Sequence, residues 1–150
     1  MQNDIITNEQ KRQVYATLKV KLKVALQQEF YLEALLLEYS ILEDRLTSML
    51  KHSDIRYTES NGREFGIQKK LNKVQNAIIS KRIPIHGKVK PALVEEILAW
   101  KETRNNLVHK SCQRLYNSDE VKKCALDGNE LVRRVTNAAS SIKHAAERLK

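Results

Sequence analysis

The chain has little of what a β-rich or disulfide-stabilised protein needs. Its 150 residues include only four glycines and two prolines, which leaves few positions for the tight turns of an all-β fold. Aromatic residues make up 5%, so nucleic-acid bases would find few side chains on which to stack. The two cysteines, Cys112 and Cys124, have neither metal-ligand nor redox-motif spacing, which favours reduced thiols in a cytoplasmic protein.

Membrane and metal signatures are also missing from the sequence. There is no long apolar run, and residues 1–4 lack the basic and then apolar pattern of a secretory signal. No group of His, Cys, Asp and Glu has metal-ligand spacing, and no glycine-rich phosphate loop or nucleophile elbow occurs. We therefore expect no membrane partner, no metal and no cofactor.

Positive charge is what the sequence has in excess, with 27 Lys and Arg against 18 Asp and Glu and a net charge of +9. Between Glu64 and Glu95 there is no acidic residue. A patch of one sign favours contact with the phosphates of RNA, and a solvated helix face is the alternative interpretation. The candidate RNA-binding residues are Lys69, Lys70, Lys73, Lys81, Arg82, Lys88, Lys90 and, further along the chain, Lys110.

Apolar residues recur at helical spacing in five segments, at about residues 7–27, 30–51, 67–80, from 91 onward and from 118 onward. The segment 30–51 has apolar residues on two faces. It is expected to be the central, most buried helix, unless its second face meets another subunit. The sequence thus predicts an all-α fold, an up-and-down bundle of four to five helices that forms one domain over residues 1–150.

Several residues predict where these helices begin and which faces are buried. Thr7 and Gln10 have capping-box spacing, Pro91 suits the first turn of a helix, and Ser118 is a favourable helix start. In the first helix, the apolar face is expected to consist of Val14, Leu18, Leu22 and Leu26.

The segment Arg104-Asn105-Asn106-Leu107-Val108-His109 places a cation, an amide and an imidazole close together. On an ideal helix Asn105 and His109 lie on one face, so the amide is expected to orient the imidazole. Arg104 lies about 140° around the helix from His109, so an active site is expected to take these groups from two copies of the chain. The alternative is ordinary surface chemistry, with His109 near a helix end and Arg104 paired with Glu102.

This motif and the segment 31–46, which includes Glu43 and Arg45, resemble the HEPN superfamily of small helical domains. The resemblance covers nearly the whole chain and implies a homodimer in which two motifs line one cleft. Many members are metal-independent endoribonucleases in toxin–antitoxin or other defence systems, whose products carry 2′,3′-cyclic phosphate and 5′-hydroxyl ends. On that basis Arg104 and His109 are the expected catalytic pair and Asn105 supports them.

The same resemblance implies RNA as the substrate, and an antitoxin or regulatory protein as a further partner. One toxin branch has Tyr two residues after the His, as the target of modification by its antitoxin. Ser111 stands there in this chain, so that mode of control is not expected. Glu43 and Arg45 are further candidates for the cleft, or form ordinary ion pairs. The alternative function is a noncatalytic helical module that binds nucleic acid or a partner protein.

Overall fold

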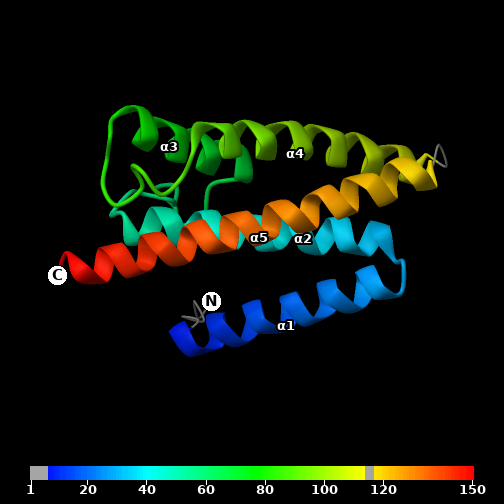
Figure 1. The fold of residues 1–150 in the computed structure, drawn as a ribbon, viewed down its shortest axis with the longest axis horizontal. Coiled ribbons are helices and arrows are strands. Elements are labelled where there is room, and N and C mark those ends of the chain that lie inside the picture. The colour runs from blue at the N-terminus through cyan, green and yellow to red at the C-terminus, as the bar shows by residue number, and fades with distance from the viewer. Residues whose placement is uncertain (1–6, 114–116) are drawn as a thin grey trace.

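Five helices make up most of the computed structural model, which describes residues 7–113 and 117–150 (Figure 1). They are α1 (Asn8–Gln27), α2 (Tyr31–His52), α3 (Ile67–Ile79), α4 (Pro91–Cys112) and α5 (Ser118–Arg148). Within those described ranges the only β-type pairing is a single bridge between Thr58 and Glu64. The predicted all-helical bundle is therefore confirmed.

Local hydrogen bonds explain where two of the helices begin. The Gln10 N–H donates to Thr7 Oγ1 over 3.1 Å, and the Thr7 N–H donates to Gln10 Oε1 over 2.8 Å, which completes the predicted capping box of α1. At α5 the capping residue is Asn117, whose side chain accepts from the N–H groups of Asp119 and Glu120. Ser118, the expected start, is the first helical residue.

The helices do not all alternate in direction. In Figure 1, α1, α2, α4 and α5 run back and forth along the bundle, and α2 and α5 lie side by side in the same direction. The shorter α3 runs parallel to α2. Its start lies near Thr47, which contacts Glu64, and its end lies near Asp54, whose carbonyl oxygen accepts from Arg82 over 2.9 Å. The segment 53–66 therefore returns the chain before α3 begins.

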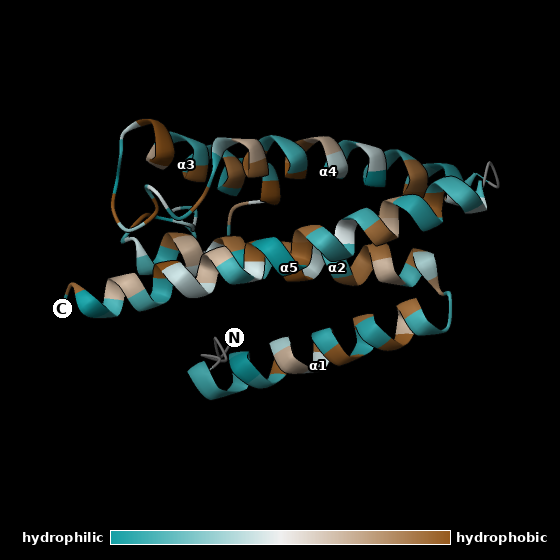
Figure 2. Cartoon of the chain, in the orientation of Figure 1, coloured by the Kyte–Doolittle hydropathy of each residue, from teal (hydrophilic) through white to brown (hydrophobic). Residues whose placement is uncertain are grey.

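The central position predicted for α2 is confirmed, because α2 packs against α1, α3, α4 and α5. Each helix carries hydrophilic and hydrophobic residues in alternation, as expected for amphipathic helices around one core (Figure 2). The expected face of α1 is wrong at one end, since Val14 is 55% exposed. Tyr15 packs on the core instead, and its hydroxyl lies 2.9 Å from Thr136 Oγ1 of α5.

None of the helices described here has both the length and the apolar character needed to cross a membrane.

Candidate functional site

Arg104 lies on the inner side of α4, where α4 meets α2. Its guanidinium carbon is 4.3 Å from the centroid of the Tyr39 ring of α2, a cation–π stack. Its Nη1 donates to Asn105 Oδ1 over 3.0 Å. The Nε atom is buried and has no hydrogen-bond partner among the described residues. The planar head of Arg104 is thus held in place while one of its edges is left unbonded.

Three ionisable side chains surround this guanidinium. Burial lowers the pKa of Arg104, and Tyr39, Cys124 and Glu43 each act in the opposite direction. Burial also raises the pKa of Glu43, an effect that Lys70 opposes most strongly and Arg104 to a lesser degree. Arginine stays protonated at neutral pH despite such a shift. The site therefore holds a half-buried, permanent cation next to a carboxyl group.

The unbonded edge of the half-buried Arg104 carries donors that match an oxyanion. The Nε and Nη2 donors of a guanidinium form a fork that matches two oxygens of a phosphate or carboxylate. A buried donor without a partner costs free energy, so such donors in folded proteins call for an explanation such as a bound ligand. Because Nε is buried, a phosphate oxygen can reach this edge only if the contact between α2 and α4 rearranges locally.

His109 lies further along α4 and is exposed. The amide nitrogen of Gln113, which can only donate, lies 3.1 Å from His109 Nε2. A neutral His109 ring in this contact accepts at Nε2 and carries its proton on Nδ1. The imidazole is thus oriented by an amide, although not by the expected one.

The predicted contact between Asn105 and His109 is wrong. Asn105 Oδ1 accepts from Arg104 instead, and a hydrogen bond to a charged donor is stronger than one to a neutral imidazole. Gln113 was missed by the sequence reasoning. Its position four residues after His109, one turn further along α4, is the signal that could have identified it.

Of the two candidates on α2, one lies near Arg104. Glu43 is one turn beyond Tyr39 on the same side of α2 and interacts electrostatically with Arg104. Arg45 is on another side of α2, where its guanidinium stacks over Tyr15 at 4.0 Å and bonds to Asp44 over 2.6 Å. Arg45 therefore fixes α1 against α2 and is not part of the Arg104 environment.

The candidate RNA-binding residues fall into separate groups. Lys69 and Lys73 lie at 4.0 and 5.8 Å from the Phe65 ring, and Lys69 also pairs with Glu59. Lys70 does not belong to an exposed surface. Its side chain is 1% exposed, and its Nζ bonds to Glu64 over 3.0 Å.

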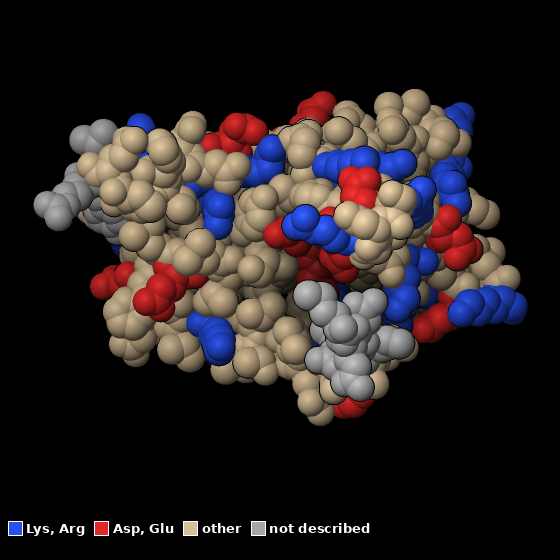
Figure 3. All heavy atoms as spheres, turned by 180° about the vertical axis from the view of Figure 1, so that it is seen from behind, with Lys and Arg blue, Asp and Glu red and all other residues tan. Residues whose placement is uncertain are grey.

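The other basic candidates, apart from Lys110, are exposed on the segment between α3 and α4. Lys110 is also exposed, but it lies near the end of α4. Lys110 lies about 30 Å along α4 from Lys90, given the rise of a helix. Figure 3, which views the molecule from behind Figure 1, shows Lys and Arg atoms gathered toward the right, with Asp and Glu among them. The exposed residues of the segment are Lys81, Arg82, Lys88 and Lys90.

Possible metal ligands and the two thiols are the other reactive side chains of the chain. No group of three or more His, Cys, Asp and Glu side chains among residues 7–113 and 117–150 could hold a metal ion. Cys112 is exposed and Cys124 is buried, and both are free thiols. Burial raises the pKa of Cys124 to about 12, and Glu38 and Asp127 act in the same direction. Cys124 is therefore an inert thiol at neutral pH.

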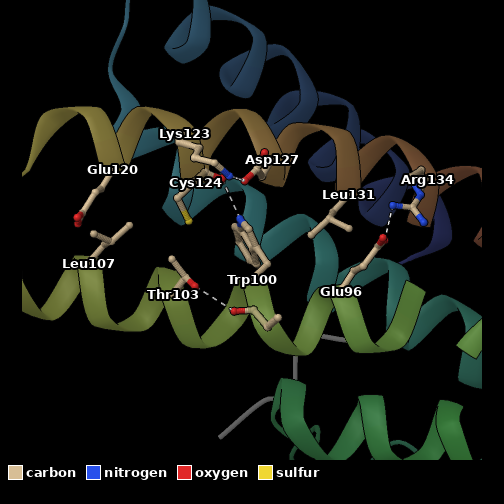
Figure 4. Close-up of a pocket in the computed structure, with 11 residues that line it drawn as sticks. Glu96, Trp100, Thr103, Leu107, Glu120, Lys123, Cys124, Asp127, Leu131 and Arg134 are labelled. Atoms are coloured by element: carbon tan, nitrogen blue, oxygen red, sulfur yellow. Dashed lines mark hydrogen bonds and ion pairs between the residues drawn. The ribbon is translucent and has the colours of Figure 1, made fainter. Parts of the chain in front are cut away.

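A groove of ≈ 500 Å³ opens between α4 and α5, on the side of α4 lined by Trp100 and Leu107 (Figure 4). Behind its wall lies Glu38 of α2, which is fully buried and has no hydrogen-bond partner for either carboxyl oxygen among the described residues. Burial raises the pKa of Glu38 to about 9, and Asp127 adds to the effect. The sequence reasoning missed Glu38, although its spacing from Leu35 and Ile41 places it on the core face of α2.

No protein-family model, curated protein or solved structure matches the chain.

Proposed function

We propose that this chain is a metal-independent endoribonuclease of HEPN type that works as a homodimer. The observation that carries the proposal is the state of Arg104, which is stacked on Tyr39 with its buried Nε unbonded. An oriented imidazole, His109, lies on the same helix. A fixed cation and an imidazole are the minimum equipment for cleaving a phosphodiester without a metal ion.

In the proposed reaction the 2′-hydroxyl of the substrate attacks the adjacent phosphorus and the bond from phosphorus to the 5′-oxygen breaks. The 2′-hydroxyl loses its proton and the 5′-oxygen gains one. His109 carries out one of these proton transfers, and Arg104 binds the phosphate oxygens as their negative charge increases. The products are a 2′,3′-cyclic phosphate and a 5′-hydroxyl.

A dimer is part of the proposal because Arg104 and His109 diverge by about 140° around α4. Arg104 is half-buried against α2, whereas His109 is exposed. A His109 from a second copy of the chain could face Arg104 without distorting either helix. Leu36, which is 51% exposed and lies three residues before Tyr39 on α2, offers apolar surface for such a contact.

The exposed lysines support RNA as the substrate. Lys81, Lys88 and Lys90 carry no acidic partner among the described residues and lie on the segment leading into α4. Such a surface attracts a polyanion and holds its backbone without reading its bases. We further propose a cytoplasmic role as a toxin or defence effector, with an antitoxin or regulatory protein as partner.

A noncatalytic nucleic-acid-binding module is the second candidate. It is favoured by the separation of Lys90 and His109 on α4, which is about 29 Å for 19 residues of helix. Binding at the lysines could then occur without any chemistry at His109. The two functions differ in whether cleavage depends on His109.

The test is to incubate wild type and His109→Ala with total cellular RNA in excess EDTA. Wild type should cleave RNA and leave cyclic phosphate ends, and His109→Ala should lose cleavage by about 100-fold or more, because no other imidazole can take its place. His144→Ala is the matched control, since His144 is also exposed but lies on α5. It should keep full activity.

Arg104→Lys should also be severely impaired, because an ammonium cannot offer the planar fork of a guanidinium. Full activity in Arg104→Lys would refute the bidentate contact with phosphate. No cleavage by folded wild type, together with salt-sensitive RNA binding, would favour the binding module.

A further inference from the structure

The groove between α4 and α5 has the size and floor of a small-molecule site. Its volume of ≈ 500 Å³ falls within the range of ligand pockets, and its floor is mostly apolar. In Figure 4, Trp100 reaches across from α4, and its indole Nε1 donates to the Cys124 carbonyl oxygen over 2.9 Å. The apolar lining residues are Ala99, Trp100, Leu107, Cys124 and Leu131.

The charges at the rim are opposite to those of the protein as a whole. Two cations line the groove, and each is already paired, Lys123 with Asp127 over 2.8 Å and Arg134 with Glu96. Glu120 also lines the groove and has no ion-pair partner among the described residues. In a chain of net charge +9, this groove is therefore lined by three carboxylates against two cations, a local excess of negative charge.

Glu38 adds a further carboxyl group directly behind the floor. It lies against Trp100 and the backbone of Gly128, since a Cβ built on Gly128 would be 2.5 Å from Glu38 Oε1 and 2.8 Å from Trp100 Cζ2. Its two unpartnered oxygens are buried among residues that line the groove. Glu38 does not itself line the groove, so it acts on the site only through Trp100 and the close approach of α5.

We propose that this groove binds a small organic cation, an amine that carries an apolar body. The apolar body packs on Trp100 and Leu107, and the ammonium group faces Glu120 on α5, which lies opposite Leu107 in Figure 4. An ammonium ion beside an aromatic ring also gains a cation–π interaction. This site is separate from Arg104 and His109 and does not depend on the proposed nuclease function.

The chain contains one tryptophan, so a single indole N–H resonance in a ¹H–¹⁵N NMR spectrum reports on the floor of the groove. The probe is 2-phenylethylammonium, and 2-phenylethanol and 3-phenylpropionate serve as neutral and anionic analogues of similar shape. We expect a saturable shift of the Trp100 indole resonance with the amine, and much weaker effects with the two analogues. Glu120→Gln should weaken amine binding by about tenfold, the usual effect of losing a charged hydrogen-bond partner.

Asp119→Asn is the matched control, because Asp119 lies beside Glu120 in the first turn of α5 but does not line the groove. It should leave the affinity for the amine unchanged. The proposal is overturned if the amine gives no saturable shift at millimolar concentrations, or if all three probes bind equally. It is also overturned if the indole resonance moves with protein concentration alone, which would assign the groove to a second copy of the chain.

Discussion

Glu38 and Lys70 are both almost completely buried, and they differ in how their charge is accommodated. Lys70 donates to Glu64 over 3.0 Å, so its ammonium group keeps a partner of opposite charge. Glu38 has no such partner among the described residues, and burial raises its pKa to about 9. Glu38 is therefore a neutral carboxylic acid at neutral pH, and this state makes stability depend on pH.

Stability should fall as the pH rises through the range between the unfolded and folded pKa values of Glu38, about 4.5 and about 9. In that range the unfolded chain releases the Glu38 proton and the folded chain keeps it, so raising the pH favours unfolding. Glu38→Gln removes this contribution to the pH dependence of stability. The free energy of unfolding of Glu38→Gln relative to wild type should increase by about 1 kcal/mol or more between about pH 5 and pH 8.

The measurement is urea unfolding of both proteins at each pH. Glu33→Gln is the control, because Glu33 is exposed on the same helix and the substitution makes the same chemical change there. A Glu38→Gln difference that stayed constant with pH would mean that Glu38 is ionised in the folded protein.

The sequence was informative about which residues form the candidate site and less so about their contacts. The Arg–Asn–x3–His spacing, taken together with its basic and helical context, predicted Arg104 and His109 as a pair. It could not reveal that Asn105 bonds to Arg104, because two acceptable partners lie within reach of one amide. The stack on Tyr39 depends on how α2 and α4 pack, which no local pattern specifies.

Among the helices, α5 shows how close packing can outweigh intrinsic helix preference. Gly128 lies inside this helix of 31 residues, where glycine is less favourable than alanine by about 1 kcal/mol. The absence of a side chain allows the backbone of α5 to approach Glu38 and Trp100. This approach requires glycine at that position.

Gly128→Ala should therefore destabilise the fold by about 1–3 kcal/mol in spite of the better helix propensity of alanine. The new Cβ would lie 2.5 Å from Glu38 Oε1 and 2.8 Å from Trp100 Cζ2, so both side chains must move. The midpoint of urea unfolding measures the change. Ser140→Ala, at an exposed position of α5, serves as the control and should be nearly neutral. Equal or greater stability of Gly128→Ala would contradict the close contact.

Helix positions were predictable because apolar spacing and capping residues act locally, as at Thr7 and Pro91. The buried face of α1 was less predictable. Val14 and Tyr15 are neighbours in the sequence, and only the position of α5, which contacts Tyr15 through Thr136, selects the second for the core. The direction of α3 could not be predicted either, because the irregular segment 53–66 that precedes it has no periodic apolar pattern.

At the scale of the whole molecule, the excess positive charge has no single location. Residues 65–94 contribute seven cations and no acidic residue, and α1 contributes a further group on its exposed side. Overall charge alone would attract RNA to either region equally. The proposed contact of RNA with the lysines before α4 therefore requires that the location of the cations matter as well as their number.

Reversing the charges of Lys88 and Lys90 to Glu should weaken RNA binding by about tenfold or more, because these exposed lysines lead into α4. Reversing Lys21 and Lys23 on α1 changes the net charge by the same amount and should have a smaller effect. Affinity of the wild type should also fall steeply with added salt. Fluorescence anisotropy with labelled RNA measures the affinity of the wild type, at each salt concentration, and of the two double variants. Equal losses from the two double variants would mean that net charge alone governs binding.

The parallel contact between α2 and α5 also constrains the order in which the chain can fold during synthesis. These two helices form the most extensive helix pair of the bundle, yet some 65 residues separate the end of α2 from the start of α5. A ribosome therefore releases α2, with its apolar face and Glu38, well before the helix that covers them. Until α5 emerges, the nascent chain must keep that face from other chains with only α1, α3 and α4 to cover it.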